Sequence, residues 1–262
     1  MRNLFLSLIV VLLSLFVVSP VALAQNAGQG GPAASSRPFD PKELSTGFTG
    51  VWSMSGVNPI GDLMTGEPPM TPAGLAKYKS EKTEYQNPPV SGVENTDPLY
   101  RCEPNSPPRH YFNGHPIEFI QSPNAVIMLI EAYRNFRIFY TDGRKHPNHP
   151  EGTWYGDSVA RWDGNTLVVD SINFNDRTWV DRLGHPHSDK MRLTERITRT
   201  AYDRMRIDIT VDDPANYTAP WGGPRNFVLR PGWIIEDYLC SPKDEAQLFK
   251  LTLDPAMDKT GK

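Results

Sequence analysis

The sequence predicts an all-β protein built on a single antiparallel up-and-down β-barrel, with one short helix and Pro-rich loops. From Pro116 onward, short segments of strand composition alternate with turn residues and leave almost no room for helices. Only the stretch after Thr71 has the start of a helix. The 25 prolines gather in the first half and in the loops, where they exclude central strands and helix interiors. A β-sandwich is the alternative architecture.

The N-terminus predicts export. Arg2 is followed by an apolar run from Leu4 to Val18, and Ala22-Leu23-Ala24 forms a small-residue cleavage site before Gln25. The alternative is an uncleaved membrane anchor, but the run is shorter than the ~20 residues that a bilayer span needs. We therefore expect a soluble periplasmic or secreted protein with no stable membrane insertion after cleavage.

The predicted domain organisation is simple. A signal peptide occupies residues 1–24, a disordered linker 25–45, one β-barrel domain 46–255 and a tail 256–262. Cleavage removes Arg2 and leaves 26 Lys and Arg against 30 Asp and Glu, a net charge of −4. This charge provides no basic field for nucleic acid or anionic lipid, so we expect neither as a partner.

Cys102 and Cys240 are the only cysteines. In an oxidising compartment an even number of cysteines favours a disulfide, which would join an early loop to the last strand. Metal binding and a catalytic thiol are the alternatives, and neither is supported by a CxxC or similar spacing.

One helix is expected near the start of the domain. Thr71 would be its N-cap and Pro72 its first residue, with the body running from Ala73 to Lys82. Leu75 and Tyr78 fall on one side, so the helix is expected to pack on the barrel as a lid or plug.

The strands are separated by turns that the sequence itself marks. Asp142-Gly143, Asp163-Gly164-Asn165 and Pro231-Gly232 have turn chemistry. The predicted strands are Phe48–Met54, Ile117–Gln121, Ala125–Tyr133, Arg137–Thr141, Ser158–Trp162, Thr166–Phe174, Met191–Thr200, Met205–Val211, Asn226–Arg230 and Trp233–Leu239.

Two glutamates are predicted to point into the barrel. Along Met191–Thr200 the apolar face carries Met191, Leu193, Glu195 and Ile197, so Glu195 is expected inside. A buried carboxylate is either a general acid or base, or a structural partner of an inward Arg, Tyr or Trp, and both alternatives stay open. Glu131 is expected to share a face with Ile127 and Leu129. The two glutamates would form a carboxylate pair if they were close.

Two long loops, residues 141–150 and 175–188, contain four of the six histidines. A hydrolytic group of His187, Ser188 and Asp181 or Asp176 is not expected, because no G-x-S-x-G elbow presents the serine. A metal on His146, His149, His185 and His187 is a weaker alternative, since no HExxH pattern is present. His187 or His146 as a base beside Arg144 fits the residue types best. The remaining alternative is that internal hydrogen bonds simply order both loops.

Several short motifs occur together between the two cysteines. They are Tyr140–Pro147 (YTDGRKHP), Arg161–Val169 (RWDGNTLVV), Gly184–Ser188 (GHPHS), Leu193–Arg196 (LTER) and Asp213–Trp221 (DPANYTAPW). The combination resembles an uncharacterised family of exported bacterial proteins, and this resemblance implies no particular reaction or ligand. More distantly, Gly50-Val51-Trp52 and the strand meander resemble lipocalin-like or calycin-like barrels, in which such a Trp closes one end.

These features favour an enzyme that acts on a small organic molecule by side-chain acid/base chemistry, of the lyase, isomerase or hydrolase type. Neither a Walker loop nor G-x-G-x-x-G is present, so no organic cofactor is expected. The alternative is a periplasmic carrier that binds an apolar or aromatic molecule in the barrel. The candidate catalytic residues are Glu195, His187, Glu131, Arg144, His146 and Asp181, and the candidate pocket walls are Tyr133, Trp154, Tyr155 and Trp179.

Overall fold

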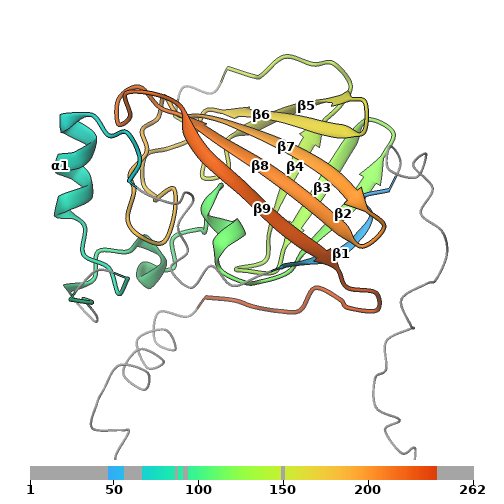
Figure 1. Cartoon of the computed structure of the whole chain (residues 1–262), viewed down its shortest axis with the longest axis horizontal. Coiled ribbons are helices and arrows are strands. Elements are labelled where there is room, and N and C mark those ends of the chain that lie inside the picture. Colours follow the sequence, from blue (N-terminus) through green and yellow to red (C-terminus); the bar gives the residue numbers. More distant parts are fainter. Residues whose placement is uncertain (1–46, 56–66, 86–87, 91–93, 149–150, 241–262) are drawn as a thin grey trace, which may run out of the picture. The chain divides into compact units, whose positions relative to one another are not determined.

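Nine of the ten predicted strand segments form a closed nine-stranded β-barrel in a computed structural model of the chain (Figure 1). The structure describes residues 47–55, 67–85, 88–90, 94–148 and 151–240. The all-β barrel fold is thereby confirmed. The predicted signal peptide, linker and tail lie outside the described residues.

The strands follow the chain in order around the barrel, and the pairing of the first with the last closes it. Most bounds agree with the predicted ranges to within a few residues. The strands are β1 (Gly50–Met54), β2 (Ile117–Ser122), β3 (Ala125–Ile130), β4 (Asn135–Tyr140), β5 (Asp157–Asp163), β6 (Thr166–Ile172), β7 (Arg192–Ala201), β8 (Arg204–Asp212) and β9 (Trp221–Leu229).

One junction corrects the prediction of a wholly antiparallel meander. β4 and β5 pair in parallel through Tyr140 and Val159, whereas all other neighbours are antiparallel. A closed ring of nine strands cannot alternate direction throughout, so one parallel junction is required. The connection of residues 141–156 supplies it, because a parallel pair needs a crossover of a dozen or more residues. The lipocalin-like assignment stays a prediction, since lipocalins have eight strands in an up-and-down order.

Three strand predictions were wrong in extent. The segment predicted as the strand Trp233–Leu239 is extended but outside the barrel, with a single bridge from Tyr238 to Ala132. β9 takes the last place and begins at Trp221, earlier than predicted. β3 ends at Ile130, because Tyr133 and Arg134 adopt positive φ angles of 60° and 49° in the turn to β4.

Side-chain alternation sets the inner face of each strand. On β7, Leu193, Glu195 and Ile197 are fully buried as predicted, and on β8 the inner residues are apolar throughout. On β3 the inner residues are Val126, Met128 and Ile130. The face that carries Ile127 and Leu129 is therefore the outer one, and the inward prediction for Glu131 was wrong because both faces of that strand are apolar.

Apart from the crossover between β4 and β5, the long connections between strands lie at one end of the barrel, which we call the loop end. The antiparallel pairings bring together the ends of β1, β3, β6 and β8 and the starts of their successors. The described parts of connection 55–116 therefore lie there with connections 173–191 and 213–220 and the short turn 131–134. The opposite end has the tight hairpins at 123–124, 164–165 and 202–203. Figure 1 shows α1 beside the loop end.

The predicted helix is present as α1 (Pro72–Ser80), two residues shorter than expected because Glu81 is already extended. The Thr71 side chain caps it by accepting from the Gly74 amide, at 3.0 Å. The Thr71 backbone amide donates to the Asn216 carbonyl at 2.8 Å, which ties α1 to the connection before β9. The 3₁₀ helices η3 (Pro98–Arg101) and η4 (Arg109–Phe112) follow, and all four residues of η4 are buried. Within the described residues, no helix has the length and apolar character required to cross a bilayer.

The tight-hairpin end is closed by Trp52, which is fully buried. Its indole Nε1 donates to the Phe48 carbonyl at 2.9 Å, and the Arg199 guanidinium lies 5.4 Å from the ring centroid. Arg199 also donates to the carbonyls of Gly47 and Tyr202. The backbone of this end is thus held by one buried arginine beside one tryptophan.

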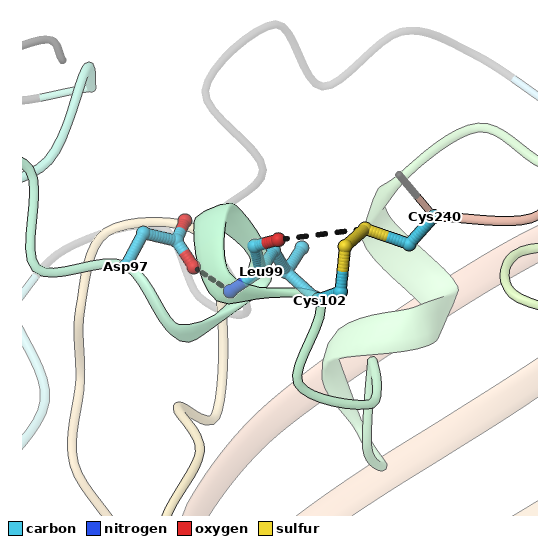
Figure 2. The surroundings of a disulfide bond; sticks show 4 residues. All are labelled: Asp97, Leu99, Cys102 and Cys240. Carbon is cyan, nitrogen blue, oxygen red and sulfur yellow. Dashed lines mark hydrogen bonds between the residues drawn. A yellow bond between two sulfur atoms is a disulfide. The ribbon is translucent and has the colours of Figure 1, made fainter. Parts of the chain in front are cut away.

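The predicted disulfide between Cys102 and Cys240 is present, with the two Cα atoms 5.5 Å apart (Figure 2). It joins the residue after η3 to the end of the extended segment 230–240, which we call the strap. In Figure 2, Asp97 accepts from the Leu99 amide and the Leu99 carbonyl faces Cys240 Sγ. A disulfide is consistent with an oxidising compartment.

Gly74 allows α1 to approach the barrel closely, because a Cβ there would lie 2.2 Å from the Asn216 carbonyl oxygen. We expect Gly74→Ala to destabilise the protein by about 1–3 kcal/mol, the usual cost of overpacking. In a free helix the same change stabilises by about 1 kcal/mol. Thermal unfolding and hydrogen exchange in α1 measure the effect. The control is Ala76→Gly in the exposed part of α1, with a loss of about 1 kcal/mol. A higher melting temperature for Gly74→Ala would contradict the close contact.

Candidate functional site

A buried ion pair crosses the barrel lumen. Arg137 on β4 donates from Nη1 and Nη2 to the two carboxylate oxygens of Glu195 on β7, at 2.7 and 2.6 Å. Both side chains are at most 1% exposed. Tyr111 of η4 donates its hydroxyl to Glu195 Oε1 at 2.6 Å. The Glu195 carboxylate therefore has a bidentate ion pair with Arg137 and a hydrogen bond from a neutral hydroxyl. A bidentate arginine–carboxylate pair is among the strongest charge-assisted hydrogen bonds in proteins.

The remaining contacts of this network are also internal. Arg137 Nη2 lies 3.1 Å from Ser171 Oγ and 3.4 Å from Ser158 Oγ, and the guanidinium is 4.8 Å from the centroid of the Phe139 ring. Burial, and after it the Glu195 charge, raise the pKa of Tyr111 well above its ordinary value, so its hydroxyl stays a donor. The geometry therefore favours the structural alternative for Glu195 over a role in proton transfer.

Sequence reasoning missed Arg137 and Tyr111. A signal existed for Arg137, because an inward Glu195 requires an inward cation and Arg137 has the same parity on its strand as the buried Phe139. No such signal exists for Tyr111, which reaches the lumen from a connection and not from a strand.

The other predicted residues are dispersed. Glu131 accepts from the Glu236 amide and lies 3.1 Å from His115 Nδ1. Arg144 is exposed and pairs with Asp142. His146 Nε2 lies 3.2 Å from Asp170, which also binds Arg192.

The predicted pocket walls are likewise apart. Trp154 lies under the Arg177 guanidinium, 4.4 Å away. Tyr155 packs against the core, and burial raises the pKa of its hydroxyl. Tyr133 and Trp179 line two different pockets at the loop end.

The first pocket, which we call the His187 pocket, has a volume of about 260 Å³. It contains two predicted residues, His187 and Trp179, together with Thr178, which precedes Trp179 in sequence and contacts His187. Lys77 of α1, Arg101 of η3 and Arg177 add three cations, and Glu81 and Asp176 add two carboxylates. The pocket therefore joins α1, η3 and the connection between β6 and β7.

Three buried side chains form a hydrogen-bonded chain at this pocket. His187 Nδ1 faces the Ser188 carbonyl oxygen at 3.3 Å, so Nδ1 carries the proton and Nε2 is the acceptor. The Thr178 hydroxyl, 2.8 Å from Nε2, must then donate to it. The Ser106 hydroxyl in turn donates to Thr178 Oγ1. Because burial lowers the pKa of His187, its imidazole is neutral near pH 7 and has its basic nitrogen directed at a hydroxyl.

The connection that carries Thr178 and His187 is held by a second histidine. His185 Nδ1 lies 2.7 Å from Asp181 Oδ2, and both side chains are at most 2% exposed. Asp181 also accepts from the amide of Leu183, at 3.0 Å, while the His185 ring stacks on Tyr78 of α1. Asp181 thus orders the loop instead of orienting His187. Ser188 donates to Asp213, so the group of His187, Asp181 and Ser188 is not assembled.

The second pocket, which we call the tyrosine pocket, has a volume of about 150 Å³. Its walls include Tyr85, Tyr100, Tyr133 and, from the strap, Tyr238, with Arg109 and Arg182 as the cations. It lies on the other side of η3 from the His187 pocket, since Pro98 and Arg101 line one and Leu99 and Tyr100 the other.

Among the described residues, no group of three or more His, Cys, Asp or Glu side chains is arranged to hold a metal ion. His149, one of the four histidines of the metal alternative, lies outside the described residues. No family model, curated protein sequence or solved structure matches this chain.

The lumen network gives a stability prediction. Glu195→Gln leaves Arg137 charged and incompletely paired in the lumen, and we expect it to destabilise the protein by about 3–5 kcal/mol. The double variant Arg137→Met/Glu195→Leu is expected to recover most of this loss, because it removes both charges. The matched control is Arg196→Ala on the same strand, whose pair with Asp163 is exposed and contributes about 0–1 kcal/mol. Urea unfolding measures all three, and a loss below about 1 kcal/mol for Glu195→Gln would contradict the structural role.

Proposed function

We propose that this protein is a periplasmic or secreted enzyme that acts on a small organic molecule by side-chain acid/base chemistry of the hydrolase type. The observation that carries the proposal is the neutral His187 imidazole with Thr178 hydroxyl as its donor on the wall of the His187 pocket. A hydroxyl and a base within hydrogen-bond reach, with the base oriented by a third group, is the arrangement of an activated nucleophile. Here the third group is the Ser188 carbonyl.

In the proposed reaction, Thr178 Oγ1 forms a bond to the carbonyl carbon of the substrate while its proton passes to His187 Nε2. His187 then gives this proton to the leaving group as the bond between carbon and leaving group breaks. Water repeats the sequence on the threonyl ester and releases the acid. Lys77 lines the pocket together with Arg101 and Arg177, both of which pair with Glu103. These cations stabilise the developing oxyanion.

Export is part of the proposal. The N-terminal pattern of Arg2, the apolar run and the Ala22-Leu23-Ala24 site supports secretion. The Cys102–Cys240 disulfide supports an oxidising compartment.

A carrier that holds its ligand inside the barrel is less well supported. The lumen is occupied by the Arg137–Glu195 pair and by large buried side chains, among them Tyr111, Phe119 and Phe227. A molecule in the lumen would have to displace a buried ion pair, which costs several kcal/mol per unpaired charge.

Thr178→Val tests the nucleophile, because it keeps the size of the side chain and removes the hydroxyl. A panel of p-nitrophenyl esters, including the hemisuccinate, supplies the substrates, and phenylmethylsulfonyl fluoride supplies a covalent probe. We expect Thr178→Val to lower the rate about 10²–10⁴-fold and to abolish the probe adduct on the Thr178 peptide in mass spectrometry. Thr178→Ser is expected to retain adduct formation. A folded wild type that neither turns over an ester nor forms the adduct would overturn the proposal.

The pH dependence follows from the lowered pKa of His187. An ordinary histidine is half protonated at about pH 6.5, whereas burial keeps His187 neutral at that pH. We therefore expect the rate of probe labelling to decline with acid only below about pH 6.5. Folded-state stability should also decrease as pH falls below about 6.5, because the unfolded chain binds the proton first. An acid limb centred at or above that value would contradict the buried neutral imidazole.

A further inference from the structure

The tyrosine pocket has the features of a second binding site, distinct in its chemical groups from the His187 pocket. Its volume of about 150 Å³ equals that of an apolar cavity known to hold a single benzene ring. The two pockets share no lining residue within the described parts of the chain: Arg109 lines the tyrosine pocket, and its guanidinium lies 5.3 Å from the ring centroid of Trp179, which lines the His187 pocket. Neither His187 nor Thr178 belongs to the lining of the tyrosine pocket.

The aromatic walls come from segments that are distant in sequence. Tyr238 on the strap lies with its ring centroid 5.7 Å from that of Tyr133 and 4.3 Å from that of His115. The disulfide at Cys240 and the bridge from Tyr238 to Ala132 hold the strap in this position. Tyr133 has a φ of 60°, a conformation that costs a non-glycine residue energy and is concentrated at functional sites.

The charges of the pocket balance. Arg109 binds both carboxylate oxygens of Asp97, at 2.7 and 2.5 Å, and this pair is buried. The second pair is loose, since Arg182 Nη2 lies 3.9 Å from Glu84 Oε1, beyond hydrogen-bond distance. Burial lowers the pKa of Arg182 and raises that of Glu84, as expected for charges that are not fully compensated. Glu84 Oε2 accepts from the Tyr100 hydroxyl at 3.2 Å, which leaves Oε1 as the acceptor that faces Arg182. A net neutral pocket with a donor on Arg182 and an acceptor at Glu84 Oε1 matches a neutral ligand that can both accept and donate.

From this geometry we infer that the tyrosine pocket binds a small neutral phenol, a single aromatic ring with one or two hydroxyls. The ring packs among the four tyrosines, and the hydroxyl oxygen accepts from Arg182 while its proton is donated to Glu84. A ligand with a carboxylate would be repelled by Glu84, and a ligand with an ammonium group would be repelled by Arg182. The inference goes beyond the proposed hydrolytic function and does not depend on it.

Titration calorimetry and saturation-transfer NMR on the full mature protein test this inference with phenol and catechol. The comparison ligands are cyclohexanol, benzoate and benzylamine, which remove the aromatic ring or add a charge of either sign. We expect phenol and catechol to bind at least ten-fold more tightly than all three. Equal binding of cyclohexanol, tighter binding of either charged ligand, or no binding of phenols at millimolar concentration would overturn the inference.

Substitutions locate the site. Tyr238→Leu and Arg182→Gln are each expected to weaken catechol binding at least ten-fold, and both residues are partly exposed, so folding is not at risk. Trp233→Leu is the matched control on the same strap, because Trp233 is 53% exposed and lies outside the pocket lining. Thr178→Val should leave binding unchanged. Catechol affinity that is insensitive to both Tyr238→Leu and Arg182→Gln would place the ligand elsewhere and refute the site.

Discussion

The ion pair between Arg137 and Glu195 is the interaction on which the loop end depends. It joins β4 to β7 across the lumen and, through the hydroxyl of Tyr111, fixes η4 in the mouth of the barrel. η4 belongs to the same connection as η3, and η3 forms a wall of both pockets. The buried charges of Arg137 and Glu195 thus help to position η3 and the walls of both pockets, with which they form no ion pair in the described part of the chain. Their cost in desolvation is offset only while both are present.

The parallel junction between β4 and β5 has a similarly wide effect. It lets the ring of nine strands close, and it requires the connection between β4 and β5 to return from the tight-hairpin end to the loop end. Every other long connection leaves and returns at the loop end, while the opposite end has tight hairpins and the Trp52–Arg199 contact. One end of the barrel is therefore a structural closure, and the connections at the other end contain most of the buried polar side chains.

The two pockets use this shared framework with different chemistry. In the His187 pocket, burial keeps an imidazole neutral and two hydroxyls donate in sequence toward it. In the tyrosine pocket, Arg182 and Glu84 lie close without a hydrogen bond to each other, and Glu84 Oε2 accepts from Tyr100. Desolvation at the loop end is the common physical cause. It keeps His187 a neutral base in the first pocket, and in the second it shifts the pKa values of Arg182 and Glu84 toward their neutral forms. Arg109 and Asp97 line the tyrosine pocket, and Trp179 lines the His187 pocket.

By itself the sequence determined the faces of β7 and β8, the start of α1 at Thr71 and the pairing of its only two cysteines. Alternation along a strand and helix capping are local properties, and two cysteines have a single way to pair. It also indicated Glu195 and His187 as buried or polar residues of interest. Only the tertiary structure decided that Glu195 binds Arg137, that His187 faces Thr178 and not Asp181, and that β4 pairs with β5 in parallel. These partners come from segments distant in sequence, so their contacts depend on barrel closure and loop path, which no local pattern encodes.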